Sequence, residues 1–249
     1  MSATSPTHLS RMRRLLGAAR TWVGQIRLQV RRWRIARRFL RGSGLEIGAL
    51  HRPLRVPSGA RVRYVDRFDA AGLRRHYPEL RAQKLVGVDV IDNGEELSSQ
   101  ADLSADFLIA NHFIEHTEDP LGTLANHLRV LRQGGILYLA VPDRHQTFDA
   151  DRPATPLEHV IRDHREGPGW SRAAHYEEWA RLVEKVPREL VPGRARTLEE
   201  ENYSIHFHVW DPREFEAVLE YAREQAKLPF SVEALTENGH EFIAILRRK

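Results

Sequence analysis

The sequence predicts an α/β fold: a doubly wound, mostly parallel sheet of seven strands, preceded by a basic amphipathic helix. Two observations carry this prediction. Between residues 45 and 141, five short runs that are apolar on both faces are separated mainly by helical stretches, as in parallel sheets covered by helices on both sides. Residues 230–246 instead predict two strands around Asn238-Gly239, a strong hairpin signal. The sheet should therefore end in antiparallel strands.

Length and composition fit one domain with an insertion. The chain has 249 residues and no cysteine, which excludes disulfides and thiolate metal sites, and it has no apolar run long enough to span a membrane. Of its 38 basic residues, 11 are arginines within residues 1–45, which contain no acid; the remainder has 27 basic and 34 acidic residues. The basic pI is thus due to the N-terminal arm and is not by itself a sign of nucleic-acid binding. We expect a cytoplasmic protein.

Residues 1–41 are predicted to form this basic helical arm. Apolar residues recur at three- and four-residue steps from Met12 to Leu40, while Arg13, Arg20, Arg27, Arg34 and Arg41 form a separate stripe. Three interpretations stay open. The apolar stripe packs on the domain, or residues 11–41 bind an anionic membrane surface at the inner face of the membrane, or they bind an RNA or protein partner.

The remaining elements follow in order. Predicted strands begin at Leu45 and cover 61–66, 85–90, 106–110, 136–141, 230–236 and 240–246, and predicted helices cover 69–80, 121–131 and 211–225. The last helix has a strong start, with Asp211 as its cap, Pro212 at its first position and Glu214 three residues after the cap. Only about 13 residues, two of them prolines, separate the first two strands, so a regular crossover helix barely fits there.

Acidic and small residues stand where the first two strands end. Glu46, Gly48 and Ala49 close the first strand, and Asp66 closes the second. Ligands of open α/β sheets bind at the carboxyl ends of the strands, where a glycine lets the backbone approach the ligand. The sparse glycines disfavour a loop that cradles a pyrophosphate.

The order of motifs resembles that of class I S-adenosylmethionine-dependent methyltransferases over residues 42–249. The matching blocks are Leu45-Glu46-Ile47-Gly48, Tyr64-Val65-Asp66, residues 92–97 and Asn111-His112-Phe113-Ile114-Glu115-His116 before Asp119-Pro120. The fourth block is similar to that of small-molecule (type 11-like) methyltransferases. Residues 206–210 and 142–144 resemble a bacterial subgroup linked to surface-polysaccharide and glycosyl-transfer pathways.

The resemblance implies S-adenosylmethionine as the cofactor and assigns roles to seven residues. Asp66 would accept hydrogen bonds from the ribose hydroxyls, and Asp92 would lie near the adenine, with Asp89 as its rival. Glu46 would lie by the methionyl end, with Gly48 and Ala49 in the adjoining loop. Asn111 and His112 would pass the methionine moiety.

Residues 143–208 are too long for an ordinary connection and predict a substrate lid over the cofactor crevice. A hydroxyl acceptor requires a base, for which the candidates are His116, His206 and His208. His206 and His208 alternate, which would permit a metal pair on a strand.

His112 to His116 also match the H-x-x-E-H signature of inverted zinc proteases, but the motif follows a strand and precedes Pro120, so we expect no protease and assign no metal ligands.

The predicted reaction is methyl transfer to an oxygen or nitrogen of a small-molecule, glycan or lipid-linked acceptor, such as a sugar of a surface glycan. Two alternatives belong to other classes. One is an RNA methyltransferase that uses the arginine-rich arm, although the acidic body makes a nucleic-acid partner unlikely to be the substrate. The other is a membrane-recruited protein that binds the cofactor without turnover.

Overall fold

Seven strands form one sheet in the computed structural model, which describes residues 8–249, with side chains from residue 24 onward. Residues 1–7 of the predicted arm, and the side chains of its next 16 residues, lie outside this description. The strand order is β3-β2-β1-β4-β5-β7-β6. The strands are β1 (Gly42–Ile47), β2 (Ala60–Asp66), β3 (Val90–Ile91), β4 (Ala105–Asn111), β5 (Leu131–Pro142), β6 (Phe230–Asn238) and β7 (Glu241–Arg248).

The pairing confirms the predicted topology. Strands β1 to β5 are parallel, whereas β7 runs antiparallel to β5 and to β6. Gly239 has φ +72°, a left-handed conformation that glycine adopts without a steric penalty, and it turns the chain between β6 and β7. The predicted third strand over 85–90 is wrong in extent. Only Val90 and Ile91 pair with β2 at this edge of the sheet.

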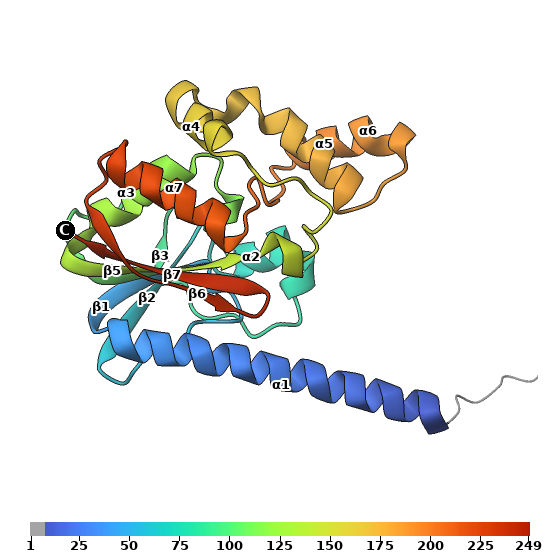
Figure 1. The fold of residues 1–249 in the computed structure, drawn as a ribbon, viewed down its shortest axis with the longest axis horizontal. Coiled ribbons are helices and arrows are strands. Elements are labelled where there is room, and N and C mark those ends of the chain that lie inside the picture. The colour runs from blue at the N-terminus through green and yellow to red at the C-terminus, as the bar shows by residue number, and fades with distance from the viewer. Residues whose placement is uncertain (1–7) are drawn as a thin grey trace, which may run out of the picture.

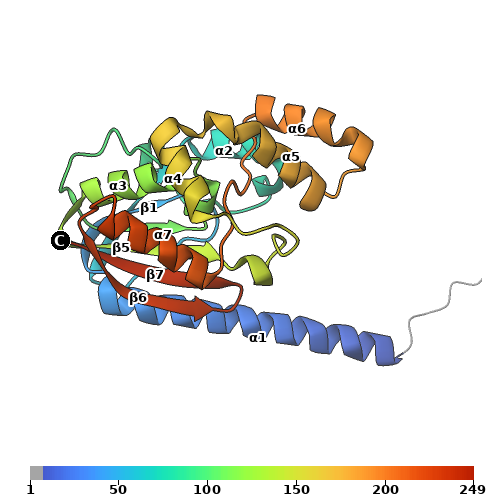
Figure 2. The ribbon, with the colours of Figure 1, turned by 45° about the horizontal axis from the view of Figure 1, so that its top comes forward.

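Helices cover both faces of the sheet (Figures 1 and 2). They are α1 (His8–Phe39), α2 (Ala70–His76), α3 (Pro120–Val130), α4 (Leu157–Glu166), α5 (Arg172–Leu182), α6 (Val191–Glu200) and α7 (Pro212–Glu224). Helices α3, α4 and α7 share the larger core, and α1 lies along the opposite face. The capping box at Asp211 starts α7 as predicted, and Pro78 divides the predicted 69–80 helix into α2 and a short 3₁₀ turn.

The carboxyl-terminal part of α1 packs on the sheet. Leu28, Ala36 and Leu40 are buried, and the last two share a core with Phe107 and Tyr138 of the sheet. The apolar stripe of the arm therefore packs on the domain over residues 28–40. The earlier part of α1 extends beyond the sheet (Figure 1). Among the described residues, no helix combines the length and apolar character that crossing a bilayer demands.

No helix connects β1 to β2, as the short spacing suggested. Residues 48–59 form an irregular loop. Leu54 anchors this loop, because its side chain joins Ala36 and Leu40 in the core and its N–H donates to Glu46 Oε1 at 2.8 Å. Helix α1 thus covers the face of the sheet on which a crossover helix would otherwise lie.

Residues 143–210, which we call the insert, connect β5 to α7. They contain α4, α5 and α6 and have a separate small core around Tyr176, Trp179 and Leu198. Figure 1 shows α5 and α6 standing away from the sheet. Apart from one isolated bridge, between Asp143 and Trp210, the insert contributes no strand to the sheet. It is therefore held by its own core, by side-chain contacts and by single backbone bonds, such as that from His208 N–H to Glu115 O, rather than by a strand ladder.

Candidate active site

A cavity of about 720 Å³ lies between the carboxyl ends of the parallel strands and the insert. Its size is in the range of roughly 300–1,000 Å³ that small-molecule sites occupy. Residues that follow β1, β2, β3 and β4 line one side, and residues of the insert line the other. Among the lining residues are Gly48, Asp66, Arg67, Tyr77, Asp92, Gly94, Glu95, His112, Phe113, His116, Tyr176, Tyr203, Ser204 and Phe207.

Asp66, predicted to bind the ribose hydroxyls of the cofactor, lines the cavity beside Gly48 of the predicted methionine-side loop. Gly48 has φ +62°, and its N–H donates to Val65 O, which brings the β1 turn against the end of β2. One Asp66 oxygen accepts from the N–H of Arg67 at 2.8 Å. Burial raises the pKa of Asp66 to about 6. Two ribose hydroxyls could donate to this carboxylate, which is partly desolvated but ionised at neutral pH.

The loop after β3 closes the cavity beside Asp66. Asp92 lines it, and its carboxylate accepts from Asn93 N–H and from both the N–H and the hydroxyl of Ser99. These bonds fix the loop. A Cβ at Gly94 would lie 2.6 Å from Ile47 and 2.7 Å from Phe113, so this position is closed to larger residues. The rival, Asp89, is not in the cavity wall; it accepts from Tyr64 N–H at the sheet edge.

His112 links the cavity to α1. It lines the cavity with φ +49°, an unusual conformation for a residue with a side chain. Its Nε2 lies 2.7 Å from Glu241 Oε2, and Arg32 of α1 binds the same carboxylate with two nitrogens. Burial alone would raise the pKa of Glu241, but the bonds from Arg32 and His112 lower it to about 2. An ionised carboxylate thus joins the helix to the cavity wall.

Three of the predicted cofactor residues are not in the cavity wall: Glu46, Ala49 and Asn111. Glu46 is buried beneath the β1–β2 loop, where it accepts from Leu54 N–H and, at 3.4 Å, from the Asn111 amide. Burial raises its pKa to about 7. Alternation along β1 explains the placement, because Glu46 faces α1 and its neighbours Leu45 and Ile47 face the larger core. The structure gives Glu46 a role in holding the loop.

Of the three predicted catalytic histidines, only His116 lines the cavity. It ends a 3₁₀ turn, Ile114–His116, directly after β4. Its Nδ1 lies 2.8 Å from the carbonyl of Ile205, so Nδ1 carries the proton and donates, leaving the Nε2 lone pair available. Burial, together with the neighbouring His206, lowers the pKa of His116 to about 3. The ring is therefore neutral at physiological pH.

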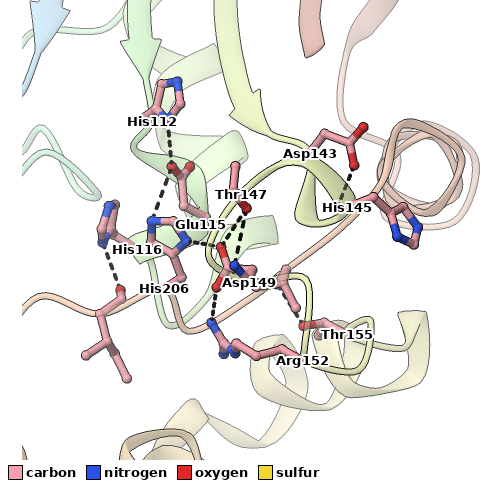
Figure 3. A network of polar contacts seen from close by, with 12 residues as sticks. His112, Glu115, His116, Asp143, His145, Thr147, Asp149, Arg152, Thr155 and His206 are labelled. Carbon is pink, nitrogen blue, oxygen red and sulfur yellow. Dashed lines mark hydrogen bonds and ion pairs between the residues drawn. The ribbon is translucent and has the colours of Figure 1, made fainter. Parts of the chain in front are cut away.

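His206 and His208 lie behind the cavity wall, in two separate polar groups. His206 Nδ1 contacts Asp149 Oδ2 at 2.7 Å, and Arg152 binds the other oxygen of Asp149 at 2.9 Å (Figure 3). His208 is completely buried near Asp163. The segment that carries both histidines is not a strand of the sheet, so the expected pair on one face does not form.

The sequence interpretation missed Glu115 as a site residue. Glu115 is buried between His112 Nδ1 at 3.7 Å and His206 Nε2 at 4.0 Å, as Figure 3 shows. Burial raises the pKa of Glu115 well above its ordinary value, which favours the protonated form. The histidines on either side of Glu115 in the 112–116 motif could have drawn attention to it, but no sequence pattern shows that its side chain points towards His206. The cavity residues Arg67, Tyr77 and Glu95 were also missed, because no sequence pattern shows that they face the cavity.

Comparison with known proteins agrees with this geometry. Residues 31–222, more than half of the chain, match the methyltransferase domain family. No curated protein sequence matches the chain significantly. A solved S-adenosylmethionine-dependent methyltransferase from Aquifex aeolicus aligns over 83% of this chain and 82% of its own, with 14% identity and a TM-score of 0.45. A structure from Thermotoga maritima, titled a possible histamine N-methyltransferase, aligns over 95% and 96%, with 16% identity and a TM-score of 0.49.

The conclusion on family rests on the match of the methyltransferase domain family, together with the strand order and the site. The sheet ends in the antiparallel pair that the Asn238-Gly239 hairpin signal predicts, and Gly48, Asp66, Asp92 and His112 line one cavity. The match does not extend to the glycan-pathway subgroup. This chain belongs to the methyltransferase domain family and has the fold of a class I methyltransferase, with S-adenosylmethionine as its cofactor.

Proposed function

We propose that this protein transfers a methyl group from S-adenosylmethionine to a hydroxyl or amine of a small or lipid-linked acceptor of the sugar class. One observation carries the proposal. A single cavity has predicted cofactor residues on one side and side chains of the insert on the other. Tyr176, Tyr203 and Ser204 supply hydroxyl groups on the insert side, and Phe207 supplies an aromatic face. Such a wall suits a polar ring with apolar edges.

His116 is positioned to serve as the base for a hydroxyl acceptor. The cofactor supplies a methyl group on a positively charged sulfur, and transfer to oxygen releases the hydroxyl proton. With Nδ1 donating to Ile205, His116 would accept that proton at Nε2. Its low pKa keeps the ring unprotonated before the reaction but makes it a weak base, so it would take the proton once methyl transfer has made the acceptor oxygen positively charged. His206 lies against His116, with ring centroids 4.6 Å apart, and would position it.

The lipid-linked class of acceptor is supported by the outer surface of α1. Arg27, Arg34 and Arg38 of α1 are exposed there beside the exposed apolar residues Ile26 and Val30, and Arg41 follows the end of the helix; the exposed Arg31 instead donates to the Glu237 carbonyl. We propose that this surface binds anionic lipid and places the cavity near a membrane-bound acceptor. Co-flotation with vesicles of anionic lipid at low salt should recover the protein, and vesicles of neutral lipid should not. Failure to float on anionic vesicles would exclude this part of the proposal.

The acceptor class is tested with a radiolabelled methyl donor. Wild type, Asp66→Ala and His116→Gln are incubated with methyl-labelled cofactor and a cell extract, which is then separated into lipid, glycan, small-molecule and RNA fractions. We expect label in the glycan, lipid or small-molecule fraction with wild type and none with Asp66→Ala. Label in RNA that disappears on deletion of residues 1–41 would support the RNA alternative. Normal cofactor binding without transfer to any fraction would support the non-catalytic alternative.

A further inference from the structure

A second group of titratable side chains lies in the insert, outside the cavity. His159 and Asp163 come from α4, His175 comes from α5, and His208 comes from the segment before α7. One ligand atom of each lies within 4.8 Å of those of the other three. We call these four residues the insert cluster.

The distances within the insert cluster fit a tetrahedral metal site. His159 Nε2 lies 3.0 Å from His175 Nε2 and 3.2 Å from Asp163 Oδ2, and His208 Nε2 lies 3.7 Å from the same oxygen. Four nitrogen and oxygen ligands at bonds of about 2.0–2.1 Å from a tetrahedral ion would be roughly 3.4 Å apart. The observed separations lie on both sides of this value.

Hydrogen bonding within the cluster leaves polar atoms unsatisfied. Among the described residues, Asp163 Oδ2 is buried and accepts no hydrogen bond of good geometry, with His159 Nε2 at 3.2 Å as a neighbour, and His208 Nε2 makes a long contact of 3.4 Å to the Glu118 carbonyl. A buried carboxylate is costly without a compensating partner.

The surroundings orient the cluster. His159 and Asp163 are four residues apart on α4 and share one face of the helix. The Ser171 hydroxyl donates to Asp163 Oδ1 at 3.1 Å, which leaves Oδ2 directed at the histidines. Outer contacts of this kind fix the ligands of metal sites.

Two other groups of three potential ligands are less suited, because their members already have partners. In the first, Glu241 binds both His112 and Arg32. In the second, His206 contacts Asp149 and His116 contacts the Ile205 carbonyl. The insert cluster also differs in having four members, the number that closes a structural zinc site.

We propose that the insert cluster binds one zinc ion, which joins α4, α5 and the segment before α7. With four protein ligands the site would have no open position, so its role is structural. Tyr176 and Phe207 are sequence neighbours of the ligands His175 and His208, and both line the cavity. The ion would therefore fix the wall that faces the acceptor.

The test measures metal binding directly and does not depend on transfer activity. Protein made without a histidine tag is stripped with chelator, and Zn²⁺ is titrated in competition with an indicator. We expect one equivalent of Zn²⁺ per chain. When Co²⁺ replaces Zn²⁺, we expect the intense visible d–d absorption bands of tetrahedral cobalt. Wild type that binds neither ion, or a cobalt spectrum typical of six-coordination, would overturn the proposal.

Variants locate the ion. Asp163→Asn and His208→Ala should weaken zinc binding by more than about 100-fold, whereas Ser171→Ala, which only removes the orienting hydroxyl, should weaken it by about 10- to 100-fold. His164→Ala is the matched control, because His164 lies on α4 but contacts Asp119 at 3.0 Å instead of the cluster. Unchanged zinc affinity in folded Asp163→Asn and His208→Ala, checked by circular dichroism, would overturn the assignment.

Discussion

The two walls of the cavity are held in place by different physical means. On the cofactor side, Gly48, Asp66 and His112 follow β1, β2 and β4, and the hydrogen-bond ladder of a parallel sheet fixes where each strand ends. The insert has no ladder. Its position depends on a small core and on buried polar groups, the Asp149–Arg152–His206 group and the insert cluster. The cofactor wall should thus tolerate loss of a side chain, and the insert should not.

The largest effect is expected from Arg152→Ala in the insert. Arg152 is buried and binds Asp149 at 2.9 Å and Glu178 at 2.8 Å. Its removal leaves the buried Asp149 charge without its arginine partner, and breaking a buried ion pair in this way typically costs about 3–5 kcal/mol. Chemical denaturation should show this loss in the free energy of unfolding. Lys185→Ala is the control, because its pair with Asp151 is exposed and worth at most about 1 kcal/mol. Equal losses in both variants would contradict the comparison.

On the cofactor wall, Asp66→Ala should weaken cofactor binding and leave the fold intact. Loss of two charge-assisted hydrogen bonds, at about 1.5–3 kcal/mol each, lowers affinity by about 100-fold or more. Titration calorimetry with S-adenosylmethionine measures the change, and thermal unfolding without cofactor should be nearly that of wild type. Wild-type affinity in Asp66→Ala would exclude the assigned role.

Glu46→Gln should distinguish the role of Glu46, near the end of β1, from that of Asp66, at the end of β2. The folded-state pKa of Glu46 is about 7, above its ordinary value of 4.5, so folding favours the protonated form and wild type loses stability as pH rises between these values. The variant removes this loss. It should be more stable than wild type by about 1–3 kcal/mol at pH 8, and the gap should close near pH 4. Cofactor affinity should change less than about twofold; a large decrease would place Glu46 in the cofactor site.

The smallest effect concerns pH. Asp66 titrates with a pKa of about 6, so it is ionised above that pH and protonated below it. Cofactor affinity of wild type should therefore fall by about tenfold from pH 7.5 to pH 5. Asp66→Asn should bind weakly and show no such fall. Calorimetry at both pH values decides between these outcomes.

The fold was predictable where local signals agree with the final packing. Apolar runs ending in Asp66 and Asn111, the capping box at Asp211 and the Asn238-Gly239 turn each depend on neighbours in sequence. The extent of the third strand was predicted wrongly, because only two of its residues pair with β2 at the edge of the sheet. Asp89 is not in the cavity wall, because its carboxylate accepts from the Tyr64 N–H. Burial of one face of α1 was one of the open interpretations, but sequence alone could not identify the surface that it covers.

Individual lining residues of the cavity were predictable mainly where the parallel strands end, whereas for the insert only its position over the cavity was predicted. Gly48, Asp66, Asp92 and His112 lie at strand ends, whereas the direction of Glu46 depended on which face of the sheet α1 occupies. In the insert, His206 and His208 are two residues apart yet lie in different polar groups. Their partners Asp149 and Asp163 come from irregular connections and another helix, which no periodicity in the sequence relates to them.

The docking of α1 has a consequence for synthesis of the chain. Its anchor, Arg32, binds Glu241, about 200 residues later, and the Asn238 amide donates to the Leu28 carbonyl. During synthesis, the part of α1 around Leu28 and Arg32 must therefore wait for β6 and β7, whereas Ala36 and Leu40 can already pack on Phe107 and Tyr138 of β4 and β5. Docking of α1 on the sheet is completed only after the last two strands have been made.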